Sequence, residues 1–335
     1  MDQTTAPNSN PAATYIERLT SSVAEQVFGL DRVIRLLAMT RIAGGHALLQ
    51  GPPGIGKTLL AKSFAQAIGG EFRRVQGTPD LMPGDVTGIS VFNSDTNTFE
   101  FKQGPLFSDV VLVDEINRAG PKTQSALLEA MEERRVTIDG NTHNLPANFL
   151  VIATQNPVDF EGTYPLPESQ VDRFLIRLDM AHTDRESEAK VLSVYGRVAG
   201  SHQQTLQEME NETNLLEAAR ASVDSMVVEP ALVDYVLDIC EATRRSEELT
   251  LGLSTRAARA LLLMARVEAC AQNYTYVRPD DLQAIAHAVA NHRLTLTPEV
   301  SFSGRTSTDV MADILARVPV PRVEAKEERN DGVEG

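Results

Sequence analysis

The sequence predicts an α/β fold with a parallel sheet, followed by an all-α domain. Three observations support this fold class. A short apolar segment at 46–50 leads directly into a G-x-x-x-x-G-K-T motif at 51–58. A second apolar segment, 109–114, ends in an acidic residue, as buried parallel strands do at the edge where ligands bind. Beyond Asp179 the strand patterns stop and helical periodicity dominates.

The length and composition are those of a globular protein with more than one domain. The chain has 335 residues, of which 42% are hydrophobic and 23% are charged. We expect a disordered leader at 1–13, an α/β nucleotide-binding core at 14–180 and an all-α domain at 184–297. A polar segment, 298–335, follows and ends in an acidic tail.

Turn and cap signals divide the core into elements. Thr14 and Glu17 have the spacing of a capping box at the start of a helix, and Asp139-Gly140-Asn141 has the residues of a hairpin turn. The expected helices are 14–28, 31–43, 59–68 and 122–134. The expected strands are 46–50, 71–76, 109–114, 149–154 and 174–179, with hairpins near 86–102 and 135–145.

The periodicity of the C-terminal part predicts helices only. Pro230 and Pro279 stand where a helix start tolerates proline. The helical segments expected there are 186–198, 206–226, 230–244, 254–272 and 279–293.

The motif at 51–58 is the Walker A phosphate loop. Its glycines let backbone N–H groups turn inward around phosphates. Lys57 can reach the β- and γ-phosphates, and Thr58 can offer its hydroxyl to Mg²⁺. The helix that follows from Leu59 points its N-terminus at the anion. The nucleotide-binding residues expected from this motif are Gly51, Pro52, Pro53, Gly54, Ile55, Gly56, Lys57, Thr58 and Leu59.

Asp114 and Glu115 form a Walker B element at the end of an apolar strand. Asp114 can hold Mg²⁺ there, and Glu115 can orient and polarise the attacking water. Two solvated acids at a strand end are the alternative. The presence of Glu115 favours turnover over nucleotide sensing alone.

Three further polar residues have two interpretations each. Asn156 can bind the γ-phosphate and the water, or form a turn before Pro157. Arg173 can pair with Asp172 at the surface, or act as an arginine finger in a neighbouring subunit. Arg256 lies in the first turn of a helix, where a cation opposes the helix dipole, which suggests another role. The residues alone leave these alternatives open.

Several function classes are disfavoured. A net charge of −15 disfavours non-specific nucleic-acid binding. The six histidines are scattered, and no zinc or Ser-His-Asp pattern is present. Cys240 and Cys270 cannot form a disulfide framework, so a cytoplasmic location is the default expectation. Neither a signal peptide nor an apolar run long enough to cross a membrane is visible.

Taken in order, these motifs resemble the MoxR family of AAA+ ATPases. The V-D-E-I-N-R, A-T-Q-N-P, L-P-E-S-Q-V-D-R-F and S-T-R sequences occur in the family's order and spacing, and the stretch 161–168 is typical of it. The resemblance extends from about residue 20 to 295. The segments that carry it are Gly44–Thr58, Thr78–Gly88, Gly104–Glu133, Ala153–Phe174 and Gly252–Ala258.

The resemblance implies roles for the three residues whose interpretation was left open above. Asn156 matches the family's sensor 1, Arg173 its arginine finger and Arg256 its sensor 2. The first hairpin resembles the insert in helix 2, and the second resembles the pre-sensor-1 hairpin. Gly29 falls where the family contacts adenine, although Leu30 stands where glutamine is usual.

The family also implies ligands and partners. ATP and Mg²⁺ are the expected cofactors. A homo-oligomeric ring, typically a hexamer, is expected because a finger acting in trans needs a neighbour. Protein clients and a von Willebrand factor A domain protein are the expected partners, with no nucleic acid. The function so implied is a ring-forming ATPase that acts as a chaperone or assembly factor; a nucleic-acid motor and a slow nucleotide-gated scaffold are the alternatives.

Overall fold

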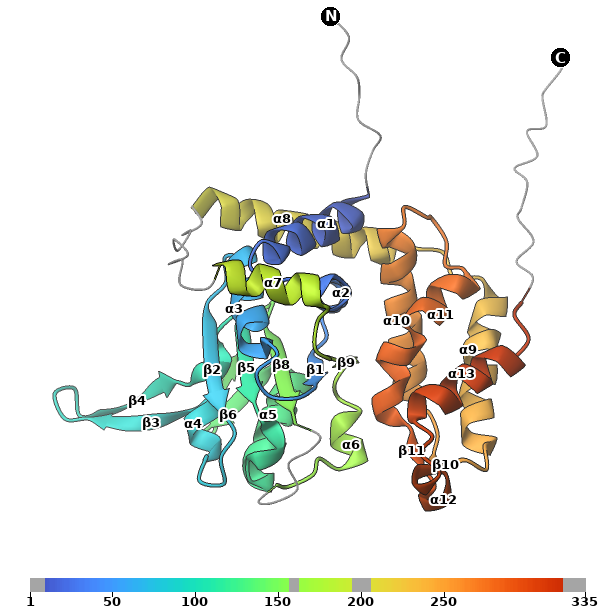
Figure 1. Cartoon of the computed structure of the whole chain (residues 1–335). Helices are drawn as coiled ribbons and strands as arrows, with labels where there is room; N and C mark the ends of the chain where they lie inside the picture. Colours follow the sequence, from blue (N-terminus) through green and yellow to red (C-terminus); the bar gives the residue numbers. More distant parts are fainter. Residues whose placement is uncertain (1–9, 157–162, 195–205, 322–335) are drawn as a thin grey trace, which may run out of the picture.

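The computed structural model describes residues 10–156, 163–194 and 206–321. The leader up to residue 9, the tail from residue 322, residues 195–198 of an expected helix and the first part of the 161–168 motif lie outside the described residues. The chain forms an α/β part and a helical part that lie side by side (Figure 1).

A five-stranded parallel sheet lies at the centre of the α/β part. Its strands are arranged in the order β2-β5-β8-β1-β9. Every strand runs in the same direction, so all the carboxyl ends meet at one edge of the sheet and all the amino ends at the other. The bounds of the strands are β1 (Ala47–Gln50), β2 (Phe72–Gln76), β5 (Val110–Asp114), β8 (Leu150–Gln155) and β9 (Ile176–Asp179).

Both faces of this sheet are buried. Along β1, Leu49 faces one apolar core and Leu48 faces another, because successive side chains of a strand point to opposite faces. The core that contains Leu49 is covered by α1 (Pro11–Ala24), α2 (Asp31–Ile42) and α3 (Lys57–Ala67). The core that contains Leu48 is covered by α5 (Pro121–Glu133). This layered arrangement confirms the predicted α/β class.

The first helix begins earlier than its sequence signals indicate. The side chain of Asn10 caps α1 by accepting from the N–H of Ala12, so Thr14 lies within the first turns and is not the cap. The predicted capping box is therefore wrong: asparagine is as strong an N-cap as threonine, and Pro11 fits the first helical position.

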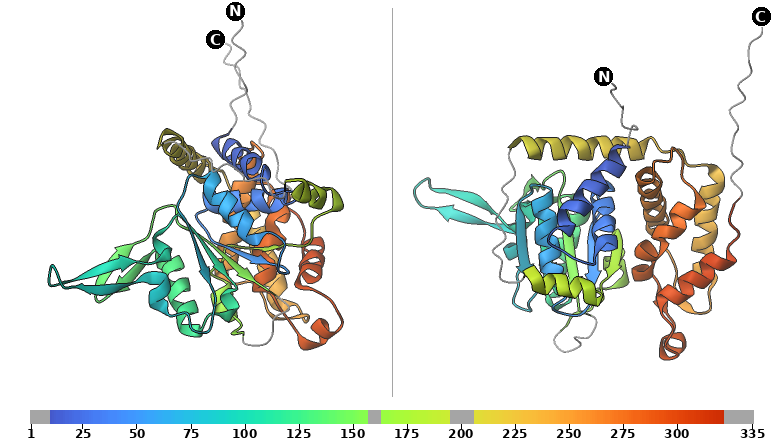
Figure 2. Two further views of the ribbon diagram at one scale, coloured as in Figure 1. Left: turned by 60° about the vertical axis from the view of Figure 1, so that its left-hand side comes forward. Right: turned by 45° about the horizontal axis from the view of Figure 1, so that its top comes forward.

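Two antiparallel hairpins extend from the α/β part. The longer one, β3 (Gly88–Asn93) with β4 (Thr98–Gln103), projects far from the sheet in every view (Figures 1 and 2). The shorter one pairs β6 (Arg135–Ile138) with β7 (Asn141–Asn144). The first was expected to begin at Val86. Residues 83–87 instead form the short helix α4, because Pro83 suits its first position and Asp85 accepts from the N–H of Met82.

The remaining elements are mostly helical. Between β3–β4 and β8 lie the short helices η1 (Pro105–Phe107) and η2 (Ile116–Arg118), and α6 (Glu168–Val171) precedes β9. The C-terminal elements are α7 (Arg185–Val194), α8 (Leu206–Asp224), α9 (Pro230–Arg245), β10 (Leu249–Leu251), α10 (Thr255–Ala271), α11 (Pro279–Ala290), η3 (Asn291–Arg293), β11 (Thr295–Leu296), α12 (Pro298–Phe302) and α13 (Ser307–Arg317).

The helical part differs from its prediction in two respects. β10 and β11 pair as a small antiparallel ladder where no strand was expected. Helix α13 buries Val310, Met311 and Ile314 in the same core as α9, although 298–335 was expected to be a polar segment. Both elements were missed because two- or three-residue strands and an amphipathic helix among polar residues give weak periodic signals.

One long helix connects the two parts. Helix α8 lies across α1 and extends toward the helical part (Figures 1 and 2). A buried network fixes this contact. The hydroxyl of Tyr15 donates to Glu212 over 2.7 Å, and the guanidinium of Arg41 contacts both Tyr15 and Glu212. The charge of Arg41, which is 96% buried, is thereby neutralised by Glu212 on α8.

Candidate functional site

The phosphate loop joins the carboxyl end of β1 to the N-terminus of α3. Gly54 and Gly56 both adopt left-handed backbone angles, with φ of 82° and 88°. Only glycine takes this conformation without cost. At Gly51 a side chain would collide with the carbonyl of Met180, so the first glycine of the motif is required by packing. The loop therefore has the backbone shape that turns N–H groups toward an anion.

Lys57 lies across the loop. Its ammonium donates to the carbonyl of Gly51 over 2.6 Å. Burial lowers the pKa of Lys57, while the charges of Asp114 and Glu115 oppose that shift. Lys57 thus shares one site with the two acids, as a Walker A lysine must.

The two acids follow β5 at the same edge of the sheet. Asp114 accepts from the hydroxyl of Thr154 over 2.6 Å and from Arg74 over 2.7 Å. The N–H of Glu115 in turn donates to the Thr154 hydroxyl over 2.9 Å. Thr154 is completely buried on the neighbouring strand β8. It fixes both acids at once, which the sequence did not reveal.

Glu115 is held in an uncommon conformation. Its φ of 54° lies in the left-handed region, which a non-glycine residue rarely adopts. The carboxylate accepts from Gln76 and from Arg118, each over 3.1 Å. Arg118 therefore contacts an acid of its own subunit in this structure. The sharp turn directs Glu115 away from the strand that carries it.

Asn156 continues the polar edge. In the sheet register Gln155 pairs with Gln50, so Asn156 lies beside the start of the phosphate loop at Gly51. Together with Gln50 and Gln155 it lines a cavity of about 320 Å³. The structure therefore brings this amide to the same edge of the sheet as Lys57 and the acids.

An apolar pocket of about 310 Å³ adjoins the loop. Its lining comes from the segment after α1, from the loop itself and from α7, and Ile55 and Leu59 are part of it. Gly29, expected near adenine, lies between the lining residues Phe28 and Leu30 and has a φ of 74°. A flat apolar base fits such a pocket. The other lining residues are Gln26, Val27, Gly54, Gly56, His182, Thr183, Glu188, Val191 and Leu192.

The donor set fits Mg²⁺ bound together with a nucleotide. Mg²⁺ in such sites takes one or two carboxylate or hydroxyl ligands and completes its shell with phosphate oxygens and water. Thr58 is the second residue of α3 and Asp114 is the last residue of β5, at the same edge. The guanidinium of Arg74 lies 2.7 Å from Asp114, so this carboxylate already attracts a cation. Among the described residues no group of three or more acids, histidines or cysteines forms a self-sufficient metal site.

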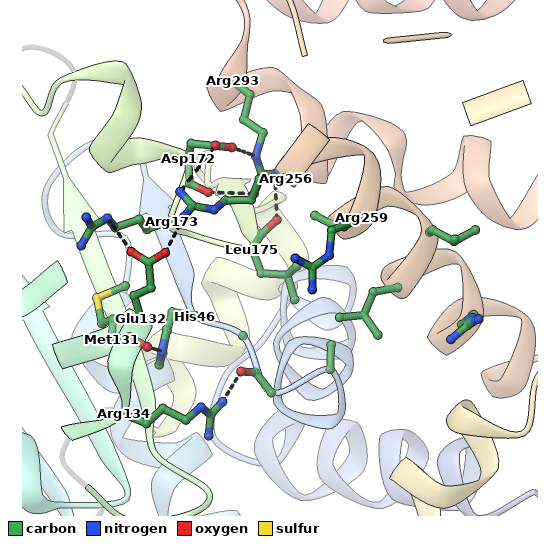
Figure 3. A pocket seen from close by; sticks show the side chains of 17 residues that line it. His46, Met131, Glu132, Arg134, Asp172, Arg173, Leu175, Arg256, Arg259 and Arg293 are labelled. Carbon is green, nitrogen blue, oxygen red and sulfur yellow. Dashed lines mark hydrogen bonds and ion pairs between the residues drawn. The ribbon is translucent and has the colours of Figure 1, made fainter. Parts of the chain in front are cut away.

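A second cavity of about 530 Å³ lies between the α/β part and α10 (Figure 3). We call its charged lining the arginine cluster: it comprises Arg134, Arg173, Arg256, Arg259, Arg266 and Arg293, with Glu132 and Asp172. Arg173 and Arg256, expected to be the finger and sensor 2, both belong to it. The cluster carries a clear excess of positive charge, so it favours an anionic ligand.

Two carboxylates organise the arginine cluster. Asp172 accepts from Arg293 over 2.7 Å and from the hydroxyl of Ser254 over 3.2 Å. Glu132 lies 3.2 Å from Arg173 and 2.5 Å from Arg256. The cluster therefore combines residues of α5, of the turn before β9, of α10 and of η3.

The arginine cluster lies far from the phosphate loop of the same chain. Leu175 pairs with His46 at the amino end of β9, whereas the loop begins beyond the carboxyl end of β1. The four paired residues span about 10 Å, and Arg173 lies beyond their far end. The cavity and the apolar pocket at the loop have no lining residue in common. One chain therefore presents its two sets of charged groups at opposite edges.

Known families match both parts of the chain. The family model described as "ATPase family associated with various cellular activities (AAA)" matches residues 46–176. The model described as "AAA lid domain" matches residues 241–314. The fold and the phosphate-loop site thus define an AAA+ ATPase with a helical lid.

Relatives of similar length show which family of AAA+ ATPases the chain belongs to. The chain is 42% identical over 315 residues to YeaC, an uncharacterised protein of Bacillus subtilis, with 92% of this chain and 97% of YeaC covered. It is 36% identical over 327 residues to the chaperone MoxR1 of Mycobacterium tuberculosis, with 95% and 85% covered. A crystal structure of a protein from Cytophaga hutchinsonii superposes with a TM-score of 0.84 at 36% identity, covering 93% and 96%. The chain belongs to the MoxR family of AAA+ ATPases.

Proposed function

We propose that this protein hydrolyses ATP at interfaces between adjacent copies in a ring, typically of six, and uses the cycle to remodel protein assemblies. The observation that carries the proposal is the separation of the two charged sets on one sheet. The phosphate loop and acids lie at the carboxyl edge, and Arg173 and Arg256 lie at the amino edge. A heterologous contact between copies brings the two edges together.

Each residue at the carboxyl edge has a defined task in this proposal. The loop N–H groups and Lys57 bind the phosphates. Thr58 and Asp114 would hold Mg²⁺, which when bound neutralises charge on the phosphate oxygens. Glu115 orients the attacking water, and Asn156 contacts the γ-phosphate and that water. Thr154 keeps Asp114 and Glu115 in position.

Arg173 and Arg256 of the neighbouring copy complete the reaction centre. A finger of this kind accelerates phosphoryl transfer by about 10³–10⁵-fold. Both arginines lie in one cavity, so we assign Arg256 to the same trans site as Arg173.

The biological role follows from the family. MoxR1 of Mycobacterium tuberculosis is named a chaperone, and we propose a chaperone or assembly role here, with protein clients and a von Willebrand factor A domain protein as partner. Cys240 and Cys270 are buried free thiols, which supports action in the reducing cytoplasm. No described helix is long and apolar enough to cross a membrane.

Mixing two inactive variants tests the shared site. Arg173→Ala should lower kcat by about 10³–10⁵-fold while a single subunit still binds ATP. Lys57→Ala should not bind ATP but keeps its arginine cluster. In an equimolar mixture, about a quarter of the interfaces pair an intact loop with an intact finger, so a comparable share of wild-type activity should return.

Two outcomes of that experiment count against the proposal. A mixture inactive at every ratio would show that the finger is not supplied by a neighbour. Full specific activity of the wild type at dilutions where only single subunits are present would exclude a shared site altogether. Mass photometry at each concentration gives the oligomeric state on which both readings depend.

A further inference from the structure

Glu132 lies between the two arginines that the proposed function assigns to the neighbouring nucleotide. Its Oε2 is 3.2 Å from Nε of Arg173, and its Oε1 is 2.5 Å from Nη2 of Arg256 (Figure 3). The three residues come from α5, from the turn before β9 and from α10. One carboxylate thus joins two residues that are 83 positions apart in the chain.

The position of Glu132 within its own helix is unfavourable. It is the penultimate residue of α5, and the negative end of the helix dipole disfavours an acid there. Glu133 has the same local problem, but its carboxylate pairs with Arg135 at the surface, with half of each side chain exposed. Glu132 instead points into the cavity. An acid placed against local preference inside a functional cavity indicates a role in that cavity.

We propose that Glu132 is a positioning residue for hydrolysis in the adjacent subunit: its carboxylate holds Arg173 and Arg256 side by side so that both face one phosphate group. This inference depends on the proposed shared site. Two guanidinium groups that converge on one point repel each other. A carboxylate between them offsets that repulsion and fixes their spacing before the phosphate is bound.

The contact does not exhaust the hydrogen-bonding capacity of the arginines. Each guanidinium has five N–H donors, whereas one carboxylate shared by two arginines can accept only a few bonds. Arg173 approaches Glu132 through Nε at ion-pair distance without forming a hydrogen bond there, so this pair does not depend on the fork formed by its terminal nitrogens. The phosphate can therefore be bound while Glu132 stays in place.

A second carboxylate, that of Asp172, contacts Arg256 and is itself bound by residues of the helical lid. Asp172, the neighbour of Arg173 in sequence, lies 3.8 Å from Arg256 and accepts from Arg293 and Ser254. Glu132 is the part of this arrangement that touches the finger itself. Because Asp172 also anchors the buried Arg293, it serves the fold, and Glu132 is the residue whose removal isolates the effect on the two arginines.

The first measurement compares Glu132→Gln with Glu133→Gln. Glutamine keeps the size of the side chain and removes its charge. For Glu132→Gln we expect kcat to fall by about 10²-fold, the magnitude of a small misplacement of reacting groups. KM for ATP and the thermal unfolding midpoint should stay unchanged, since the phosphate loop and the core are intact. The matched control Glu133→Gln should keep wild-type kcat.

Two further measurements separate positioning from a structural role. Glu132→Gln has an intact loop, so mixing it with Lys57→Ala subunits should restore activity through the intact arginines of the latter. In a double-mutant cycle, adding Glu132→Gln to Arg173→Ala should cost little more than Arg173→Ala alone, because the carboxylate acts through the finger.

The outcomes distinguish this inference from the proposed function. Wild-type or higher kcat in Glu132→Gln, while Arg173→Ala and Lys57→Ala still complement each other, overturns the inference alone. Losses that add fully in the double variant, or a defect that mixing does not repair, also overturn it. Failure of Arg173→Ala and Lys57→Ala to complement removes the shared site on which both proposals depend.

Discussion

The carboxyl edge and the amino edge of the central sheet are built in different ways. The carboxyl edge takes its chemistry from short motifs that directly follow strands: the loop after β1, the acids after β5 and Asn156 after β8. The amino edge has no such motif. Its arginine cluster is assembled by packing α5 and the turn before β9 against α10 and η3.

The difference explains why one copy of the chain is only half of the proposed site. The carboxyl edge presents acids and a loop suited to anions, and the amino edge presents arginines in excess over the two carboxylates beside them. The net charge of −15 hides this local positive cluster. A sum over the chain therefore says little about what one cavity attracts.

A large loss of activity should come from a change at the carboxyl edge. Glu115→Gln removes the group that polarises water, and we expect kcat to fall by about 10²–10⁴-fold while ATP binding is retained. Single-turnover hydrolysis and nucleotide titration measure the two quantities. Turnover at the wild-type rate would remove Glu115 from its assigned role and would place the catalytic acid elsewhere.

The same variant gives access to clients. If hydrolysis stops after ATP is bound, the ring should retain its partners, and these can be isolated with the Glu115→Gln protein in ATP. Lys57→Ala is the control, because it cannot bind ATP. Recovery of the same proteins with both variants would show that capture does not depend on the nucleotide cycle.

A smaller effect, on stability, distinguishes the two ends of β9. Asp172→Asn at the amino end removes the counter-charge of Arg293, whose side chain is 97% buried, and should lower the free energy of unfolding by about 3–4 kcal/mol. Asp179→Asn at the carboxyl end removes a pair with Arg177 in which the aspartate is 54% exposed. That change should cost under about 1 kcal/mol. Equal decreases in the free energy of unfolding for Asp172→Asn and Asp179→Asn, measured by urea unfolding, would contradict this prediction.

A further effect on stability concerns acid pH at the amino edge. His46 lines the arginine cavity, and its Nδ1 accepts from the N–H of Val151 over 3.0 Å, so the proton of the neutral ring is on Nε2 and faces the carbonyl of Met131. Burial above all lowers the pKa of His46 to about 4, and the nearby charge of Arg134 adds to that shift. Protonation of Nδ1 would break the bond to Val151.

The direction of the change in stability with pH follows from which state of the chain binds the proton. Between pH 6.5 and 4 the unfolded chain binds the proton at His46 and the folded chain does not, so stability is lost as pH falls. From pH 6.5 to 4.5 the loss attributable to His46 is roughly 2 kcal/mol. The unfolding free energies of wild type and His46→Gln should therefore converge on acidification. Parallel pH curves would show that this ring does not titrate as stated.

The sequence predicted the carboxyl edge almost completely. Lys57, Asp114 and Asn156 could be placed together because each follows a strand, and parallel strands end at one edge. Thr154 escaped prediction because a threonine inside an apolar strand gives no signal of its own. The β10–β11 ladder and α13 escaped for a related reason: their patterns are too short or too polar to stand out.

At the amino edge, the sequence indicated individual residues but not how they contact one another. Arg173 and Arg256 were assigned by family resemblance, and nothing in the sequence indicated that they share one carboxylate. Glu132 and Glu133 are indistinguishable in sequence. The orientation of the helix end and the packing of α10 decide which of them faces the cavity, and both are properties of the folded chain.

The buried network of Tyr15, Arg41 and Glu212 has a practical consequence for truncation experiments. A shortened ATPase that starts at the strand before the phosphate loop would keep every motif, yet it would lack α1 and α2. Glu212 would then lose both hydrogen-bonding partners, and the apolar surface beneath α8 would be exposed to water. A working minimal version must therefore begin no later than Asn10, the residue that caps α1 and also contacts Asn273 at the end of α10.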